Sequence, residues 1–199
     1  MIIPQGEYIY EIREQGRLIA TETAQLSADQ LTGVRTAADG SGNRHEVQAD
    51  LDAEGVVRAI RLRYVRGPFS RSASYEAAGD TLSGVVTAVG ARNTLEAKLG
   101  RFKEVDGGLT LFKALLIAHV RSRGQKRWTA RVAVIDPATL VPKTVKESVY
   151  ELDSKPGTWM FEPAIGERET IVVDEAGRIL THTTRTGISS VLVSGKELS

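Results

Sequence analysis

The sequence predicts a mainly-β fold class: one soluble domain over residues 1–199, built as a curved antiparallel sheet or open barrel with one apolar helix in its concavity. Three observations support this prediction. Apolar and polar residues alternate along most of the chain, and turn residues recur roughly every 8–12 positions, as in β-sandwiches and barrels. The third is a nearly uninterrupted apolar segment, Leu109–Val120, which breaks the alternation. Hydrophobic residues make up 41% of the chain, enough to bury a core.

The strands predicted before the apolar segment follow from the alternation. In the first, Glu7–Arg13, the side chains of Tyr8, Tyr10 and Ile12 share one face. A short polar turn closed by Gly16 separates it from the next strand, and this predicts a hairpin. The other strands predicted in this half are Leu18–Leu26, Val34–Ala38, Arg44–Leu51, Val56–Arg66, Ser70–Ala77, Thr81–Val89 and Thr94–Phe102.

The apolar segment Leu109–Val120 is predicted to be a buried helix. Thr110 is a candidate N-cap, Arg121 and Arg123 suit the negative end of a helix dipole, and Gly124 suits the C′ position. A helix that is apolar almost all round must be buried almost all round. The alternative is a central strand buried on both faces, because periodicity does not separate the two for a short apolar run.

Strands are again predicted after this segment, and charge is unevenly distributed there. Residues 107–135 contain no acidic side chain, whereas acidic residues prevail over residues 147–175. The two stretches are therefore expected to pair across a sheet. The predicted strands are Trp128–Ile135, Lys143–Leu152, Thr158–Phe161, Glu169–Val173, Arg178–Thr184 and Ile188–Val193.

Motifs for catalysis, cofactors and metals are missing from the sequence. There is no cysteine, which excludes disulfides, thiolate metal sites and cysteine nucleophiles, and no glycine-rich phosphate loop is present. The three histidines, His45, His119 and His182, are scattered without metal-ligand spacing, so each is interpreted as a hydrogen-bonded structural residue. We therefore predict a protein that is not an enzyme and carries neither metal nor cofactor.

Two charged patterns are interpreted as solvated surface. The pairs Glu147 with Glu151 and Glu167 with Glu169 each fall on one face of a predicted strand, which is most simply the wet face of the sheet. The basic stretch Arg121–Arg131 contains a tryptophan, but aromatic residues make up only 6% of the chain and do not interleave with it. Nucleic-acid binding is therefore not predicted.

Composition also bears on location and partners. The net charge is +1, so no global field attracts an anionic membrane. No apolar run approaches the ~18 residues of a membrane span, and the start of the chain has no secretory signal. The chain as given is expected to be cytoplasmic, or periplasmic if an export signal has been removed. The sequence does not indicate whether it forms a homo-oligomer.

The two ends of the chain carry a resemblance to known families. The opening Tyr8-x-Tyr10-x-Ile12 with Gly16-x-x-Ile19, and the late Asp174-x-x-Gly177-x-Ile179, look like the terminal hairpins of two bacterial groups. These are the half-barrel outer-membrane lipoprotein carriers and the spiral β-roll glycolipid-binding domains. The resemblance covers the order of elements over most of the chain, implies a sheet curled around a helix, and transfers no site residue.

A curled sheet has an apolar concave side that side chains, a helix or a ligand must fill. We therefore predict non-enzymatic binding of an apolar or amphipathic, lipid-like small molecule; the alternative is a structural or protein-interaction module using a strand edge. A cavity of roughly 300–1,000 Å³ beneath the helix would favour a ligand site, and a solid core would favour the scaffold. The candidate ligand-binding residues are Tyr64, Phe69, Tyr75, Phe112, Leu116, His119, Trp128 and Trp159.

Overall fold

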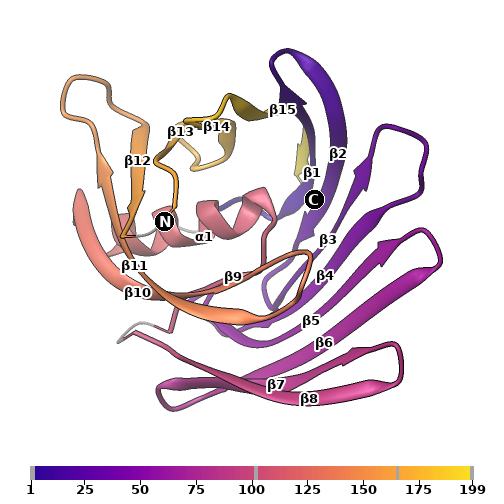
Figure 1. The fold of residues 1–199 in the computed structure, drawn as a ribbon. Helices are drawn as coiled ribbons and strands as arrows, with labels where there is room; N and C mark the ends of the chain where they lie inside the picture. The colour runs from indigo at the N-terminus through magenta and orange to yellow at the C-terminus, as the bar shows by residue number, and fades with distance from the viewer. Residues whose placement is uncertain (1–2, 101–102, 165, 198–199) are drawn as a thin grey trace.

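A computed structural model describes residues 3–100, 103–164 and 166–197. Within these residues, a 15-stranded sheet curls around one helix, α1 (Thr110–Ser122), as Figure 1 shows. The predicted mainly-β fold class, with a helix in the concavity of an unclosed sheet, is confirmed. The strands are β1 (Gly6–Glu14), β2 (Arg17–Leu26), β3 (Gln30–Ala37), β4 (Arg44–Leu51), β5 (Val57–Arg66), β6 (Phe69–Ala78), β7 (Thr81–Ala88), β8 (Ala91–Lys98), β9 (Val105–Asp106), β10 (Arg127–Ile135), β11 (Pro142–Glu151), β12 (Thr158–Pro163), β13 (Glu169–Val173), β14 (Ile179–Thr184) and β15 (Ile188–Glu197).

The sheet is a meander whose first and last strands meet. The strand order is β8-β7-β6-β5-β4-β3-β2-β1-β15-β14-β13-β12-β11-β10-β9, so the N-terminal and C-terminal strands pair in the middle of the sheet. Every pairing is antiparallel except that of β9 with β10. The two ends of the sheet therefore belong to β8 and to the short β9.

The β8 end approaches β10 and β11 near the other end of the sheet without forming a ladder. The Thr144 hydroxyl of β11 donates to the Lys98 carbonyl of β8 at 2.8 Å, and the Gly100 N–H donates to the Arg131 carbonyl at 3.1 Å. Isolated contacts of this kind hold the curl but leave the sheet open. The result is a β-barrel-like shell with a seam beside β8.

Period-2 alternation along the strands supplies the core. On β4, His45, Val47, Ala49 and Leu51 are buried while the residues between them are half-exposed. The register with β5 places Val47 opposite Leu62 and Ala49 opposite Ile60, so inward side chains of neighbouring strands stack in layers. This inward apolar face must be covered by something other than water, and α1 covers it.

Helix α1 lies in the concavity, where Figure 1 shows it surrounded by the curled sheet. Eight of its residues are buried, which confirms the predicted buried helix and shows that the strand alternative is wrong. Glycine on β3 allows a close approach at its start, since a Cβ on Gly33 would lie 2.6 Å from Leu109 Cδ1 and the leucine side chain would have to shift. The predicted helix end is confirmed, because Gly124 has φ of +65° and donates its N–H to the Arg121 carbonyl.

The predicted N-cap is wrong. Leu109, not Thr110, occupies the N-cap position, and it makes no side-chain capping bond. The helix start is buried against the sheet, so a carboxylate from another strand replaces the local cap.

The predicted strands are confirmed with shifted boundaries. β3 begins at Gln30 rather than Val34, and β8 begins at Ala91 rather than Thr94, because pairing with neighbours extends strands beyond their alternating cores. The predicted end of β8 at Phe102 lies outside the described residues, and the strand ends at Lys98. The two-residue β9 has no period and was not predictable from alternation.

Candidate functional site

The first turn of α1 is anchored by a buried carboxylate. Glu22 on β2 is fully buried, and its Oε1 accepts the Thr110 N–H at 2.8 Å. The same carboxylate lies 2.6 Å from the Arg35 guanidinium on β3. A negative charge at the N-terminus of a helix satisfies an orphan N–H and opposes the positive end of the dipole. Glu22 thereby takes the role that the sequence assigned to Thr110.

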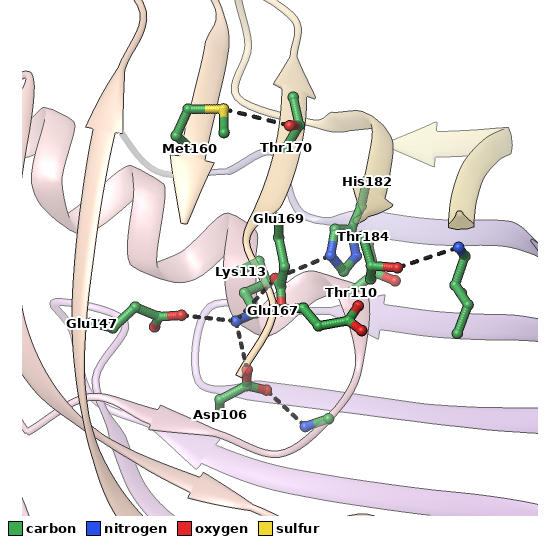
Figure 2. A network of polar contacts seen from close by, with 12 residues as sticks. Asp106, Thr110, Lys113, Glu147, Met160, Glu167, Glu169, Thr170, His182 and Thr184 are labelled. Carbon is green, nitrogen blue, oxygen red and sulfur yellow. Dashed lines mark hydrogen bonds and ion pairs between the residues drawn. The ribbon is translucent and has the colours of Figure 1, made fainter. Parts of the chain in front are cut away.

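One turn further on, Lys113 forms the centre of a buried ion network, shown in Figure 2. Its Nζ lies 3.2 Å from Asp106 Oδ2, 3.3 Å from Glu147 Oε1 and 3.3 Å from Glu169 Oε2. It also lies 4.9 Å from the centre of the Phe161 ring, within cation–π range. The side chain is only 10% exposed, so three carboxylates replace its lost hydration.

The electrostatics of this network favour charge on Lys113 and Glu169. Burial opposes ionisation of Glu169, but the hydrogen bond from His182 and the charge of Lys113 outweigh it and lower the pKa from 4.5 to about 2. Burial likewise opposes the charged form of Lys113, yet Asp106, Glu147 and Glu169 raise its pKa above the ordinary value. An ammonium held this firmly is not a nucleophile at neutral pH.

Glu147 is the member of the network whose charge is least well compensated. Burial raises its pKa, with the Lys113 charge acting in the opposite direction. Its second oxygen, Oε2, is buried and has no hydrogen-bond partner among the described residues. The prediction that Glu147 and Glu169 lie on a wet face is wrong, because the inward face of this half of the sheet meets a lysine on α1. The basic and acidic stretches do pair across the sheet, since β10 pairs with β11 and Lys126 lies 3.9 Å from Asp153. They pair between helix and sheet as well, through Lys113 with Glu147 and Glu169.

The three histidines occupy different environments. His182 on β14 lies 3.1 Å from Glu169 and so extends the network, and His119 on α1 lies 3.1 Å from the buried Glu104. His45 on β4 is buried, and neither of its ring nitrogens has a hydrogen-bond partner among the described residues. Burial lowers its pKa from 6.5 to about 4, so it is neutral at physiological pH. The interpretation of His45 as hydrogen-bonded is wrong.

The network acts as a clamp on the helix. Through Lys113 it ties α1 to β9, β11 and β13, while Glu22 ties the first turn to β2. Within the described residues, no three histidine or acidic side chains are grouped so that they could hold a metal ion. The centre of the acidic cluster is occupied by the Lys113 ammonium instead.

The space directly beneath α1 is nearly solid. A cavity of about 30 Å³ remains between the helix, β9 and β10, with Phe112, Leu116 and Val132 among its walls. That volume is close to the share of one water molecule in the liquid. A cavity of this size cannot hold a small-molecule ligand, so the interior directly beneath the helix is packed core.

A larger groove lies beside the C-terminal half of α1. It has a volume of about 600 Å³ and runs between the helix and the β2–β3 and β4–β5 turns. Leu115 and Ala118 are only partly buried and face this groove. Its remaining walls are Ile3, Gln5, Leu26, Ser27, Ala28, Leu51, Ala53, Glu54, Gly55, His119, Ser122 and Arg123.

The groove adjoins the small cavity. Gly55, Leu115 and His119 line both, so the two spaces lie side by side. Most of the groove's lining surface is apolar, and its polar side chains are Gln5, Ser27, Glu54, His119, Ser122 and Arg123. An apolar floor with a few polar groups is the usual composition of a small-molecule site.

The eight sequence-predicted binding residues do not come together in one pocket. Phe112, Leu116 and His119 line the small cavity, and His119 also lines the groove. Tyr64 and Phe69 line a separate surface hollow of about 630 Å³ beside the β5–β6 turn. Three others line neither the cavity nor the groove: Tyr75, whose hydroxyl donates to the Leu140 carbonyl at 2.7 Å; Trp128, whose ring is 6.3 Å from His119; and Trp159, which is fully buried.

Sequence reasoning missed most of the groove. Its walls include small apolar residues next to turns, such as Ala28 and Ala53, which carry no periodic signal. One feature of the ion network was visible in advance: Lys113 interrupts an otherwise apolar segment. A charge in a segment that must be buried requires partners, and this could have pointed to the acidic stretch.

Comparisons with known proteins support the fold. No family model and no curated protein matches the chain. A crystal structure of a β-barrel-like protein of domain of unknown function DUF1849 from Brucella abortus superposes with a TM-score of 0.60 at 13% identity, covering 99% of each chain. A crystal structure of a DUF1089 family protein from Pseudomonas aeruginosa superposes with a TM-score of 0.56 at 19% identity. The match covers 80% of this chain and 86% of that chain.

These likenesses show a β-barrel-like fold and nothing about activity. Neither protein is described as a lipoprotein carrier or a glycolipid-binding protein, so the families named from the terminal hairpins are not supported beyond the shape. Among the described residues, no helix has the length and apolarity needed to cross a bilayer.

Proposed function

We propose that the protein binds an apolar or amphipathic, lipid-like small molecule, without catalysis, in the groove beside the C-terminal half of α1. The observation that carries this proposal is the 600 Å³ apolar-floored groove. Its volume falls within the roughly 300–1,000 Å³ of small-molecule sites. The ligand would lie on the flank of α1 and not beneath the helix, because the core beneath the helix is packed.

The asymmetry of α1 supports this location. The N-terminal half is fixed by Glu22 and Lys113, which hold the helix in the shell without a ligand. On the flank that faces the groove, Leu115 and Ala118 are only partly buried, so an apolar guest would remove their exposed surface from water. An apolar tail would lie against these residues, and a polar head would reach the rim near Ser122 and Gln5.

A non-catalytic role fits the charged groups. Lys113 is engaged by three carboxylates and its pKa is raised, which leaves it protonated. Lys113 does not line the groove, so binding there would rest on the groove's shape and apolar lining.

Native mass spectrometry of gently purified protein, before and after delipidation, tests the proposal, followed by titration with a fluorescent fatty acid. We expect added mass that delipidation removes, and saturable probe binding. Ala118→Trp fills the groove and should weaken probe binding by about tenfold or more, equivalent to about 1.4 kcal/mol. Ser83→Trp, on an exposed position of β7, is the matched control and should bind like the wild type.

Apo mass in both states together with no probe binding would contradict the proposal. Equal binding by the Ala118→Trp variant would place any ligand elsewhere. The first result would favour the alternative of a scaffold without a ligand pocket, and the second would contradict the groove as the binding site.

A further inference from the structure

Strand β8 ends the sheet and leaves one edge without a partner strand. It is the first strand in the sheet order, and Figure 1 shows the β7–β8 hairpin at the margin of the shell. Its residues from Ala91 to Thr94 are all exposed. Within the described chain, the only hydrogen bond to this edge from beyond the strand is that of Thr144 to the Lys98 carbonyl at the far end. The strand also contains no proline, the residue that commonly protects an edge.

The direction of the backbone groups on β8 follows from its flanking bonds. The Leu99 N–H donates toward β7, to the Asp80 carbonyl at 2.7 Å, whereas the Lys98 carbonyl faces the opposite side and accepts from Thr144. Backbone direction alternates along a strand, so even-numbered residues face the free edge. Arg92, Thr94 and Glu96 therefore present their N–H and C=O groups outward.

The charges along this edge are complementary to those of the same edge in a second copy of the chain. If a second β8 pairs antiparallel about a two-fold axis at Thr94, Arg92 of each copy lies opposite Glu96 of the other. In that register the even-numbered residues, whose backbone groups face the edge, lie opposite one another, so the Arg92–Glu96 and Thr94–Thr94 pairs can each exchange two hydrogen bonds. Sliding the register by one pair in one direction sets Arg92 against Lys98, which repel.

Neither charge is engaged within its own chain. Arg92 and Glu96 lie opposite Thr87 and Ser83 on β7, which are uncharged. Among the described residues, no ion pair involves either side chain. Both charges are thus available to a partner strand.

We propose that β8 is a self-association edge, at which a second copy of this chain adds its own β8 antiparallel in the register centred on Thr94. The partner is another copy because the edge matches its own charge pattern under two-fold symmetry. The interface is a continuous sheet across two shells, held by main-chain hydrogen bonds and two Arg92–Glu96 pairs.

Sedimentation equilibrium of the full chain, at concentrations up to about 1 mM, tests the proposal. We expect a monomer–dimer equilibrium that weakens when the ionic strength rises from about 0.01 M to 1 M, because the paired charges are solvent-exposed. Arg92→Glu and Glu96→Arg should each weaken self-association by about tenfold, since each turns two attractions into two repulsions. An equimolar mixture of the two variants should recover the wild-type affinity, because each strand then meets the opposite charges.

Arg58→Glu is the matched control, since Arg58 is an exposed arginine on β5, away from the edge. It should dimerise like the wild type, and circular dichroism should show all variants folded. A wild type that stays monomeric at the highest concentration overturns the proposal. The proposal is also overturned if Arg92→Glu and Glu96→Arg dimerise as tightly as the wild type. If both variants are weakened but their mixture does not recover the wild-type affinity, the proposed register is wrong.

Discussion

Replacing Glu169 by Gln measures how much the ionised Glu169 carboxylate contributes to folding stability. The folded protein lowers the pKa of this carboxyl from 4.5 to about 2, against burial, through His182 and Lys113. At about 1.4 kcal/mol for each tenfold change in proton affinity, ionised Glu169 contributes about 3 kcal/mol of folding stability. A carboxyl with a depressed pKa contributes fully above the unfolded value, so this contribution is present at pH 7 and is lost as pH falls from about 5 to 2.

Urea unfolding of wild type and variant, at pH 7 and at pH 3, measures the effect. We expect Glu169→Gln to lose about 2–3 kcal/mol at pH 7 and much less at pH 3, where the wild type has lost most of this contribution. Glu147→Gln is the control. Because burial raises the pKa of Glu147, its ionisation opposes folding, and that variant should be neutral or more stable at pH 7. Equal losses in the two variants, or a Glu169→Gln loss that does not change with pH, would contradict a stabilising charge on Glu169.

Three further substitutions test other parts of the structure. Lys113→Met leaves three buried carboxylates without their cation and should cost about 3–5 kcal/mol by urea unfolding; a loss under 1 kcal/mol would contradict the clamp. Glu22→Gln removes the charge at the start of α1 and should speed amide exchange in its first turn, with a cost of about 1–2 kcal/mol; unchanged exchange would contradict the anchoring role. Gly84→Ala places a Cβ 1.9 Å from the Ser74 carbonyl oxygen and should cost about 2 kcal/mol of stability in thermal unfolding. The control Ser83→Ala, at the exposed neighbouring position, should change stability by no more than about 0.5 kcal/mol. Equal effects of the two substitutions would show that the backbone relaxes around Gly84.

The strands and the helix were predictable because each leaves a local periodic trace. Alternation on β4 marks the same inward residues that the structure buries, and the apolar run marked α1 before any contact was known. Helix capping was not predictable, because the group that caps α1 comes from Glu22, which is 88 residues away from Thr110 in sequence. Local capping rules consider only neighbouring residues.

The candidate site was harder to predict for the same reason. Glu147 shares its strand face with Val149, and Glu169 shares its face with Ile171 and Val173, so both carboxylates lie on the buried side of the sheet. Their common partner, Lys113 on the opposing helix, is distant in sequence, so no local pattern joins the three. The groove is formed by turns and by one flank of α1, whose proximity depends on how far the sheet curls. Curl is a property of the whole meander and leaves no motif in the sequence.

Locating a bound fatty acid tests the binding groove beside α1 directly. A ¹H–¹⁵N NMR titration with a fatty acid, in a protein with assigned backbone amides, reports which residues sense the guest. We predict saturable shifts concentrated at Ala28, Ala53, Gly55, Leu115 and Ala118, with little change at the β5–β6 turn. Shifts centred on Tyr64 and Phe69 instead, or no saturable shifts at all, would contradict a binding groove beside α1.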